Sequence, residues 1–219
     1  MTLPRTFRKS RDNILASFSF TDLASGTGFV TYNGFNSEDS NGLDFHLTEK
    51  STGFSQVVGQ TIDLSGSGTA FDLDFDTSTF NLPRTIEGEA IVTLGCGLES
   101  LVTTGGRATI TVKIRKWDGS TETEIVSVTS ATDILTVTAG NNEQELLVIP
   151  LTVPRTLIKK GELLRLTIII EYTKVGGSGD GRVILGHDPK DRDFDKLTPS
   201  SNKNHTTSII FEAPFRINI

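Results

Sequence analysis

The chain of 219 residues contains a single cysteine, Cys96, so it cannot form an internal disulfide bond. This scarcity favours a reducing compartment, or a protein that is assembled in one. Cys96 lies within the small, apolar stretch 94–98, and we interpret it as a buried apolar residue rather than a catalytic thiol.

The sequence also lacks a long apolar run. No segment approaches the roughly 18 apolar residues of a membrane-spanning helix, and residues 1–13 lack the apolar centre of a signal peptide. We therefore expect neither a signal peptide nor a membrane partner. The formal net charge of −6 likewise makes nucleic acid an unfavourable partner.

Catalytic motifs are missing as well. The three histidines, His46, His187 and His205, show no metal-binding spacing, and no Gly-x-Ser-x-Gly elbow occurs. The glycine-rich stretch Gly176–Gly181 precedes an apolar segment typical of a strand, whereas a phosphate-binding loop precedes a helix. From the sequence we expect no catalytic residues and no enzyme activity.

A 3.6-residue helical periodicity is absent, and about ten short segments instead alternate apolar and polar residues between turn signals. The clearest segment is Leu163–Tyr172, one face of which is entirely apolar. We expect this face in the core: Leu164, Leu166, Ile168 and Ile170. Asp118-Gly119 is the strongest hairpin signal, while the polar stretch Asn33–Gly42 is predicted to be an exposed loop. We predict an all-β, antiparallel, jelly-roll-like β-sandwich, with an immunoglobulin-like sandwich as the alternative.

The N-terminal segment differs in charge from the acidic remainder. It carries four cationic side chains, Arg5, Arg8, Lys9 and Arg11. We therefore divide the chain into a basic N-terminal arm, residues 1–13, and a single β-sandwich domain, residues 14–219. The arm is either a solvated tail or an element that docks on an acidic neighbour.

Two further features are candidate contact sites, which join the cations of the arm as predicted partner-binding residues. In the predicted strand around Thr69–Phe75, alternation puts three carboxylates on one face: Asp72, Asp74 and Asp76. These like charges are either solvated, or they bind a cation or a basic neighbour. Trp117, beside the predicted hairpin turn, is either an exposed contact residue or packs over the hairpin.

The segment after Gly186 contains the best candidate metal site. Four carboxylates occur within eight residues: Asp188, Asp191, Asp193 and Asp195. Calcium favours such oxygen ligands, although Lys196 and Asn202 occupy the positions at which an EF-hand needs Gly and Glu. The alternative is a solvated or salt-bridged loop, because basic residues are interspersed. Calcium is the only cofactor hypothesis that the sequence offers.

Four stretches of the chain are similar to one group of viral proteins: Phe18–Gly28, Ile158–Leu166, Leu185–Pro189 and Ala213–Phe215. They resemble uncharacterised β-rich virion structural proteins of tailed bacteriophages and related viruses. The resemblance implies a head decoration or tail component, and it supplies no catalytic residues.

We accordingly expect a structural virion protein (capsid, head decoration or cement, or tail component) that acts through protein–protein assembly. Its expected partners are copies of itself, in a homo-oligomer, and other virion proteins. Its expected location is the virion, after synthesis in the host cytoplasm. The alternative is a carbohydrate-binding module for host or glycan recognition, although one Trp and two Tyr offer few rings for sugar stacking. A hydrolase built from scattered carboxylates ranks third.

Overall fold

The computed structural model describes residues 27–40, 42–50, 55–101, 105–131, 133–192, 194 and 207–216. Within these ranges every regular element is a β-strand, which confirms the predicted all-β fold. The described residues accordingly contain no helix that could cross a membrane.

The described residues form twelve strands. They are β1 (Thr27–Asp39), β2 (Gly42–Thr48), β3 (Gly59–Leu64), β4 (Gly68–Asp76), β5 (Arg84–Ser100), β6 (Gly105–Trp117), β7 (Glu122–Thr129), β8 (Leu135–Val137), β9 (Asn142–Ile158), β10 (Leu163–Val175), β11 (Gly181–Gly186) and β12 (Ile209–Arg216).

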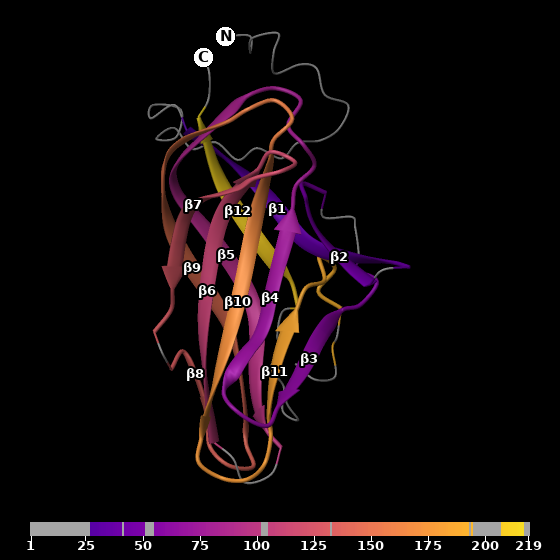
Figure 1. Ribbon diagram of the computed structural model, residues 1–219, viewed down its shortest axis with the longest axis vertical. Helices are drawn as coiled ribbons and strands as arrows, with labels where there is room; N and C mark the ends of the chain where they lie inside the picture. The colour runs from indigo at the N-terminus through magenta and orange to yellow at the C-terminus, as the bar shows by residue number, and fades with distance from the viewer. Residues whose placement is uncertain are drawn as a thin grey trace, which may run out of the picture.

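The strands are arranged as two layers of a β-sandwich (Figure 1). One layer consists of β4, β10 and β6, with β7 and β8 following one another along the outer edge of β6. The other layer is built on β5, which pairs with β9 along one edge and with β12 and β11 in succession along the other. β1 and β2 continue this layer beyond β12, and β3 continues it beyond β11.

The two layers join where β2 runs beside β4. This is a single parallel pairing, of His46 with Asp76, whereas all other strand pairs among the described residues are antiparallel. The pairing therefore confirms the predicted antiparallel sandwich and adds one parallel contact between its layers.

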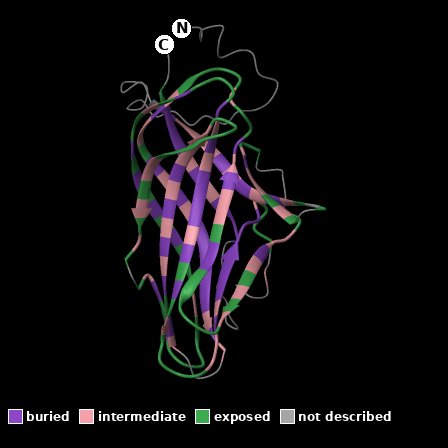
Figure 2. Cartoon of the chain, viewed as in Figure 1, coloured by how far each residue is buried: buried purple, intermediate pink, exposed green. Residues whose placement is uncertain are grey.

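The inner faces of the strands form the core, seen as buried stripes in Figure 2. On β10 the predicted core face is confirmed, because Leu164, Leu166, Ile168 and Ile170 are all fully buried. Along β9, alternate side chains likewise point into the core: Leu147, Ile149, Leu151 and Val153. Burial of alternate β-branched and leucine side chains is the main apolar contribution to such a sandwich.

The predicted hairpin at Asp118-Gly119 is confirmed between β6 and β7. Trp117 pairs with Glu122, and Gly119 has a φ of 96°, a conformation that favours glycine. The Asp118 carboxylate accepts hydrogen bonds from the backbone N–H groups of Thr121, at 2.7 Å, and Ser120, at 2.9 Å. These bonds lower the pKa of Asp118 and fix the turn.

The prediction of an exposed loop over Asn33–Gly42 is wrong, because β1 continues to Asp39 and β2 begins at Gly42. The register pairs Asn33 with Thr48 and Glu38 with Leu43, so the polar stretch forms much of a hairpin. Asn36 is almost completely buried there and its amide is bonded to partners far along the chain.

Candidate binding groove and the predicted site residues

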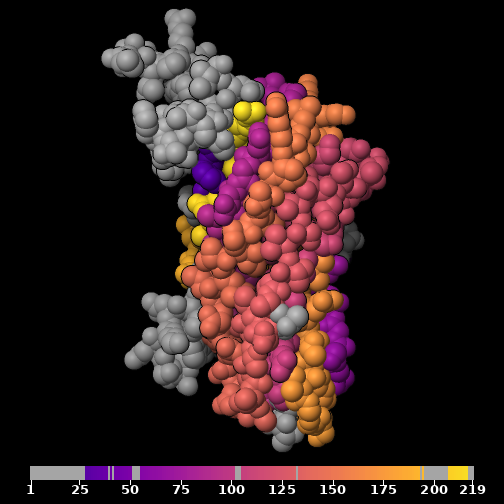
Figure 3. Space-filling view, turned by 90° about the vertical axis from the view of Figure 1, so that its left-hand side faces the viewer, coloured from indigo at the N-terminus to yellow at the C-terminus, as the bar shows by residue number. Residues whose placement is uncertain are grey.

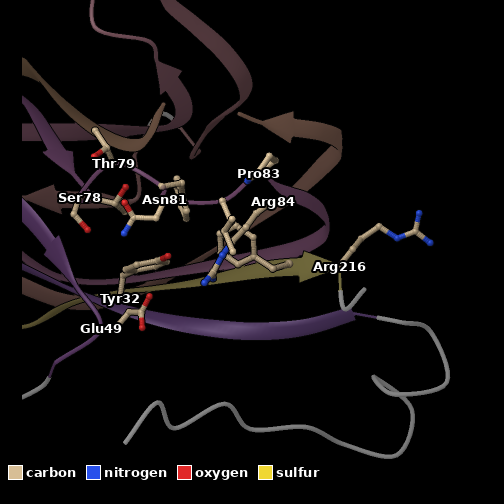
Figure 4. A pocket seen from close by; sticks show the side chains of 12 residues that line it. Tyr32, Glu49, Ser78, Thr79, Asn81, Pro83, Arg84 and Arg216 are labelled. Carbon is tan, nitrogen blue, oxygen red and sulfur yellow. The ribbon is translucent and has the colours of Figure 1, made fainter. Parts of the chain in front are cut away.

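A groove of about 460 Å³ lies beside the segment that connects β4 to β5 (Figure 4). Its lining comes from β1, β12, the residue after β2 and this connection: Tyr32, Glu49, residues 77–84, Phe215 and Arg216. Its volume is within the usual range of small-molecule sites. The groove therefore combines aromatic, cationic, carboxylate and amide groups from four separate segments.

Arg84 is held in this groove by two aromatic rings. The carbon of its guanidinium lies 5.6 Å from the ring centre of Phe80 and 5.5 Å from that of Phe215. The two rings are themselves in contact, with centres 5.9 Å apart. Within the part of the chain that the structure describes, Arg84 forms no ion pair with a carboxylate. Its charge is therefore oriented by cation–π contacts rather than neutralised by a neighbouring acid.

Tyr32 provides the adjoining wall of the groove. Its ring stacks on Phe211, with centres 6.0 Å apart, and only 3% of the residue is exposed. Burial raises the pKa of Tyr32, the Glu49 carboxylate raises it further, and Arg84 acts in the opposite direction. In Figure 4, Tyr32 and Glu49 lie along one side, and Asn81 and Arg84 project toward them from the other. A carboxylate, a guanidinium and a phenol therefore lie together in this groove.

A second cavity, of about 880 Å³, continues this groove along β2 and shares with it Tyr32, Glu49, Thr77, Ser78 and Asn81. His46 lies in this extension, where its Nε2 is 2.8 Å from the Ser37 hydroxyl oxygen. The His46 ring also contacts Phe35, with centres 5.0 Å apart. The extension adds polar side chains, and the whole groove offers both donors and acceptors to a hydroxyl-rich ligand.

The predicted acidic stripe lies on the outer face of β4, and the structure brings two of its members to one cation. Arg165 donates to Asp76 through Nε, at 2.7 Å from Oδ1, and through Nη2, at 2.8 Å from Oδ2. Its Nη1 lies 3.3 Å from Asp74 and 3.1 Å from Glu122. The hydrogen bond with Asp76 is the main cause of a raised pKa of Arg165. Asp74 and Asp76 are thus paired within the chain, whereas Asp72 is exposed.

Trp117 belongs to the same cluster, because the Arg165 guanidinium carbon lies 5.3 Å from its ring centre. The residue is half-buried at the end of β6. Sequence periodicity placed Trp117 and the aspartates on strand faces but gave no sign that Arg165 would connect them. Binding of a partner by Asp72, Asp74, Asp76 or Trp117 remains a prediction.

The predicted calcium ligands are described only in part, because Asp193 and Asp195 lie outside the described residues. Asp188 is fully buried and accepts from the Arg192 guanidinium, at 2.8 Å, and from the Ser55 backbone N–H, at 2.9 Å. The Asp191 carboxylate accepts from the Thr207 backbone N–H. Among the residues that the structure describes, no group of acidic, His or Cys side chains could hold a metal ion. Calcium binding therefore stays a prediction, and it would have to compete with Arg192 for Asp188.

Beside Asp188 lies a buried polar cluster that the sequence did not reveal. Asn36 Nδ2 is 2.7 Å from His187 Nδ1, and the Ser55 hydroxyl donates to the His187 backbone oxygen. His187 and Ser55 are fully buried. Because the Ser55 hydroxyl bonds to a backbone oxygen, the geometry is not that of a Ser-His nucleophile pair. The cluster instead connects β1 and the segment before β3 to the end of β11.

The basic arm is also outside the described residues. Its candidate contact residues, Arg5, Arg8, Lys9 and Arg11, are therefore not placed, and their partner-binding role stays a prediction.

No protein-family model matches the chain, and no curated protein sequence matches it either. Solved structures do show similarity. A CocE/NonD family hydrolase from Staphylococcus aureus has a TM-score of 0.46 and 12% identity, over 85% of this chain and 37% of the hydrolase. An α-amino acid ester hydrolase has a TM-score of 0.40 and 11% identity, over 66% of this chain and 25% of that one.

A capsid protein is also among the similar structures. The VP2 subviral particle of infectious bursal disease virus has a TM-score of 0.29 and 14% identity, over 86% of this chain and 40% of that chain. The chain thus spans between a quarter and two fifths of the length of these three proteins. With TM-scores this low, none of these similarities assigns an activity or a role to this chain.

The expectation that the chain is not an enzyme is nevertheless contradicted. The similar structures include an α-amino acid ester hydrolase, a CocE/NonD family hydrolase and an aminopeptidase. The physical reason for the error lies in the use of short motifs. A missing motif excludes only those sites whose residues lie close together in the sequence, whereas sandwich strands bring together residues from distant positions.

Proposed function

We propose that this protein is a structural virion component that acts through protein–protein assembly, with copies of the same chain as its first partners. The viral location, and a role as capsid, decoration or tail component, belong to the same proposal. It is supported by one observation above all, an exposed apolar surface along β9.

This surface, the β9 apolar face, consists of the outward side chains Leu146, Val148, Pro150 and Leu157. Leu146 is 51% exposed, Val148 60% and Leu157 51%, so three of the five exposed large apolar residues in the described part of the chain lie on this strand. The register places Pro150 opposite the half-buried Ile91 on β5, which extends the apolar area sideways, and Val148 opposite Thr93. Contiguous exposed apolar area marks an interaction surface more often than isolated residues do.

The way β9 is built favours contact through its face rather than its edge. β9 lies at the surface of the side that faces the viewer in Figure 3. Pro150 and Pro154 cannot donate a backbone hydrogen bond, and prolines disfavour strand addition along an edge. A second copy would therefore bury the outward side chains of β9, not extend its sheet.

The proposal is tested by Val148→Glu, measured by size-exclusion chromatography with light scattering. We expect the unaltered chain to form oligomers and the variant to dissociate, because a carboxylate buried at an interface without a partner is strongly unfavourable. Val175→Glu is the matched control, since Val175 is 45% exposed but lies at the end of β10. A chain that is monomeric at every concentration, or an oligomer that Val148→Glu leaves intact, contradicts assembly through this face.

A carbohydrate-binding role is the second candidate function, and the groove at Tyr32 and Arg84 favours it. Sugar sites combine aromatic surface with hydrogen-bond donors and acceptors. Beside Phe80 in this groove, Arg84 donates, Glu49 accepts and the Asn81 amide does both. A glycan array probed with the labelled chain tests this role, and uniform lack of binding contradicts it.

A further inference from the structure

We propose that the groove at Tyr32 and Arg84 selects saccharides that carry a carboxylate, with Arg84 as the specificity-determining residue. The proposal rests on the second candidate function and deepens it by naming the class of sugar. It concerns ligands such as sialic and uronic acids, whose single carboxylate lies next to several hydroxyl groups.

Arg84 presents an oriented positive charge to the groove. Its guanidinium is positioned by Phe80 and Phe215, and in the described part of the chain no carboxylate pairs with it. Several other arginines of the described part are paired, for example Arg165 with Asp76, Arg182 with Asp63 and Arg216 with Glu87. Arg107 and Arg155, like Arg84, form no ion pair there, but only Arg84 is held by two aromatic rings. A guanidinium presents its donors as a planar fork that matches a carboxylate. Arg84 is thus preorganised for an acid that the described chain does not itself supply.

The groove also contains a carboxylate, that of Glu49. Glu49 and Arg84 line the same groove, and in Figure 4 they lie on opposite sides of it beside Tyr32, so a negative and a positive charge face the same space. A ligand of high negative charge, such as a phosphate, would be repelled by Glu49. A ligand with one carboxylate and adjacent hydroxyl groups satisfies both, because its acid faces Arg84 and its hydroxyls donate to Glu49.

The remaining lining fits the body of a sugar ring. Asn81 provides an amide donor and acceptor, and Ser78 and Thr79 provide hydroxyl groups. Leu82 is 72% exposed, the highest value among the large apolar residues described, and offers contact to an apolar C–H face. The volume of about 460 Å³ suits one or two sugar rings better than a long chain.

The test is a titration of the full chain, followed by nuclear magnetic resonance shifts of backbone amides, with two matched pairs of probes. N-acetylneuraminate is compared with its neutral methyl ester, and glucuronate with neutral glucuronamide. We expect the acids to bind and to shift amides of residues 77–84, with the neutral partners at least about tenfold weaker, because they lack a charge-assisted hydrogen bond. Binding of the acids should weaken in high salt.

Arg84→Gln should reduce acid binding by about tenfold to a hundredfold and leave the weak binding of the neutral probes unchanged. Arg107→Gln is the control, because Arg107 is an exposed arginine near the start of β6, opposite Thr173 rather than near the groove. Should Arg84→Gln unfold, Arg84→Lys retains the charge without the planar fork and is expected to show an intermediate loss.

The outcomes separate this proposal from the function beneath it. Equal binding of acidic and neutral probes, insensitive to Arg84→Gln, leaves a carbohydrate site but overturns selection by Arg84. Binding only to other glycans of an array, with no shifts at residues 77–84, overturns the location. If no saccharide binds in either experiment, the second candidate function fails together with this proposal. Binding of acidic peptides, but not of the acidic sugars, also overturns it.

Discussion

The surroundings of His187 fix the protonation state of its ring. It is fully buried, and its Nδ1 lies 2.7 Å from the amide nitrogen of Asn36. The Asn36 oxygen accepts from the Val57 backbone N–H, at 3.0 Å, so the amide must present its N–H group to the histidine. The His187 Nδ1 is therefore an acceptor and the ring is neutral. Burial lowers the pKa of His187 from 6.5 to about 4.

This shift predicts a specific loss of stability in mild acid. Between the unfolded pKa of 6.5 and the folded pKa of about 4, the unfolded chain binds a proton that the folded chain does not. The free energy of unfolding should fall as the pH is lowered through this window, by on the order of 3 kcal/mol in total. Chemical denaturation at several pH values measures it, and His187→Gln should remove most of the slope.

The effect of His187 on stability falls in a different pH range from that of Asp188. Asp188 has a lowered pKa, so its contribution is present above the ordinary value of 3.8 and is lost only below it. Identical slopes for the unaltered chain and His187→Gln between about pH 6.5 and about pH 4 would contradict a neutral, buried His187.

Among the elements, β10 joins a fully buried apolar face to a charged outer face. It pairs with β6 from Leu163 to Val175 and with β4 from Arg165 to Tyr172, so it is bonded on both edges. One face of β10 is fully buried, while the other holds Arg165 and its ion pairs. The strand therefore connects the apolar interior with the charged outer surface.

Ile168→Ala should reduce the free energy of unfolding by about 2–5 kcal/mol, because it removes buried methyl groups and leaves a cavity. The control is Ile169→Ala on the opposite face of β10, where the side chain is only half-buried and the loss should be smaller. Denaturant unfolding measures both variants. A loss below about 1 kcal/mol for Ile168→Ala would mean that the site collapses around the deletion.

Near the end of β10, the ring of Tyr172 packs against two glycines, Gly106 and Gly181. A Cβ at Gly106 or at Gly181 would overlap the Tyr172 ring, which is almost completely buried. Gly106→Ala should therefore lower the free energy of unfolding by about 1–3 kcal/mol through overpacking.

Gly68→Ala is the matched substitution for this prediction, because no atom lies within 4 Å of a Cβ built there. It should change stability by no more than about 0.5 kcal/mol. Thermal unfolding that ranks the two variants equally would show that the Tyr172 ring moves aside without cost.

At the scale of the whole molecule, charge and apolar area are distributed between different regions. The cations of the arm stand against an acidic remainder, and the apolar area suited to holding copies together lies on β9. Opposite potentials steer encounter and fix orientation more than they add affinity. In the proposed assembly, the β9 apolar face would supply the binding free energy and the arm its electrostatic guidance.

Deleting residues 2–12 is expected to weaken assembly, and more strongly at low salt, where charge interactions are least screened. Light scattering of the full and shortened chains at two ionic strengths measures this effect. Replacing Arg5, Arg8, Lys9 and Arg11 together by Gln is the matched variant, since it keeps the length of the arm. If all three chains assemble equally well at low ionic strength, the arm is a solvated tail with no role in assembly.

The sequence by itself determined the features that depend on neighbours within a few residues. Period-two alternation identified the strand class and the inward faces of β4 and β10, because successive side chains of a strand point to opposite faces. The turn at Asp118-Gly119 was equally readable, since a short hairpin turn is specified by the residues that form it.

Only the tertiary structure decided which faces meet. Arg165 and Asp76 are 89 positions apart, and Asn36 and His187 are 151 positions apart. The same distance explains why Asn33–Gly42 was mistaken for a loop, since its buried member Asn36 finds its partners at Val57 and at His187, just after the end of β11. The groove likewise draws on Tyr32, Glu49, Arg84 and Phe215 from four segments. Alternation tells which way a side chain points, but long-range strand pairing decides what it touches.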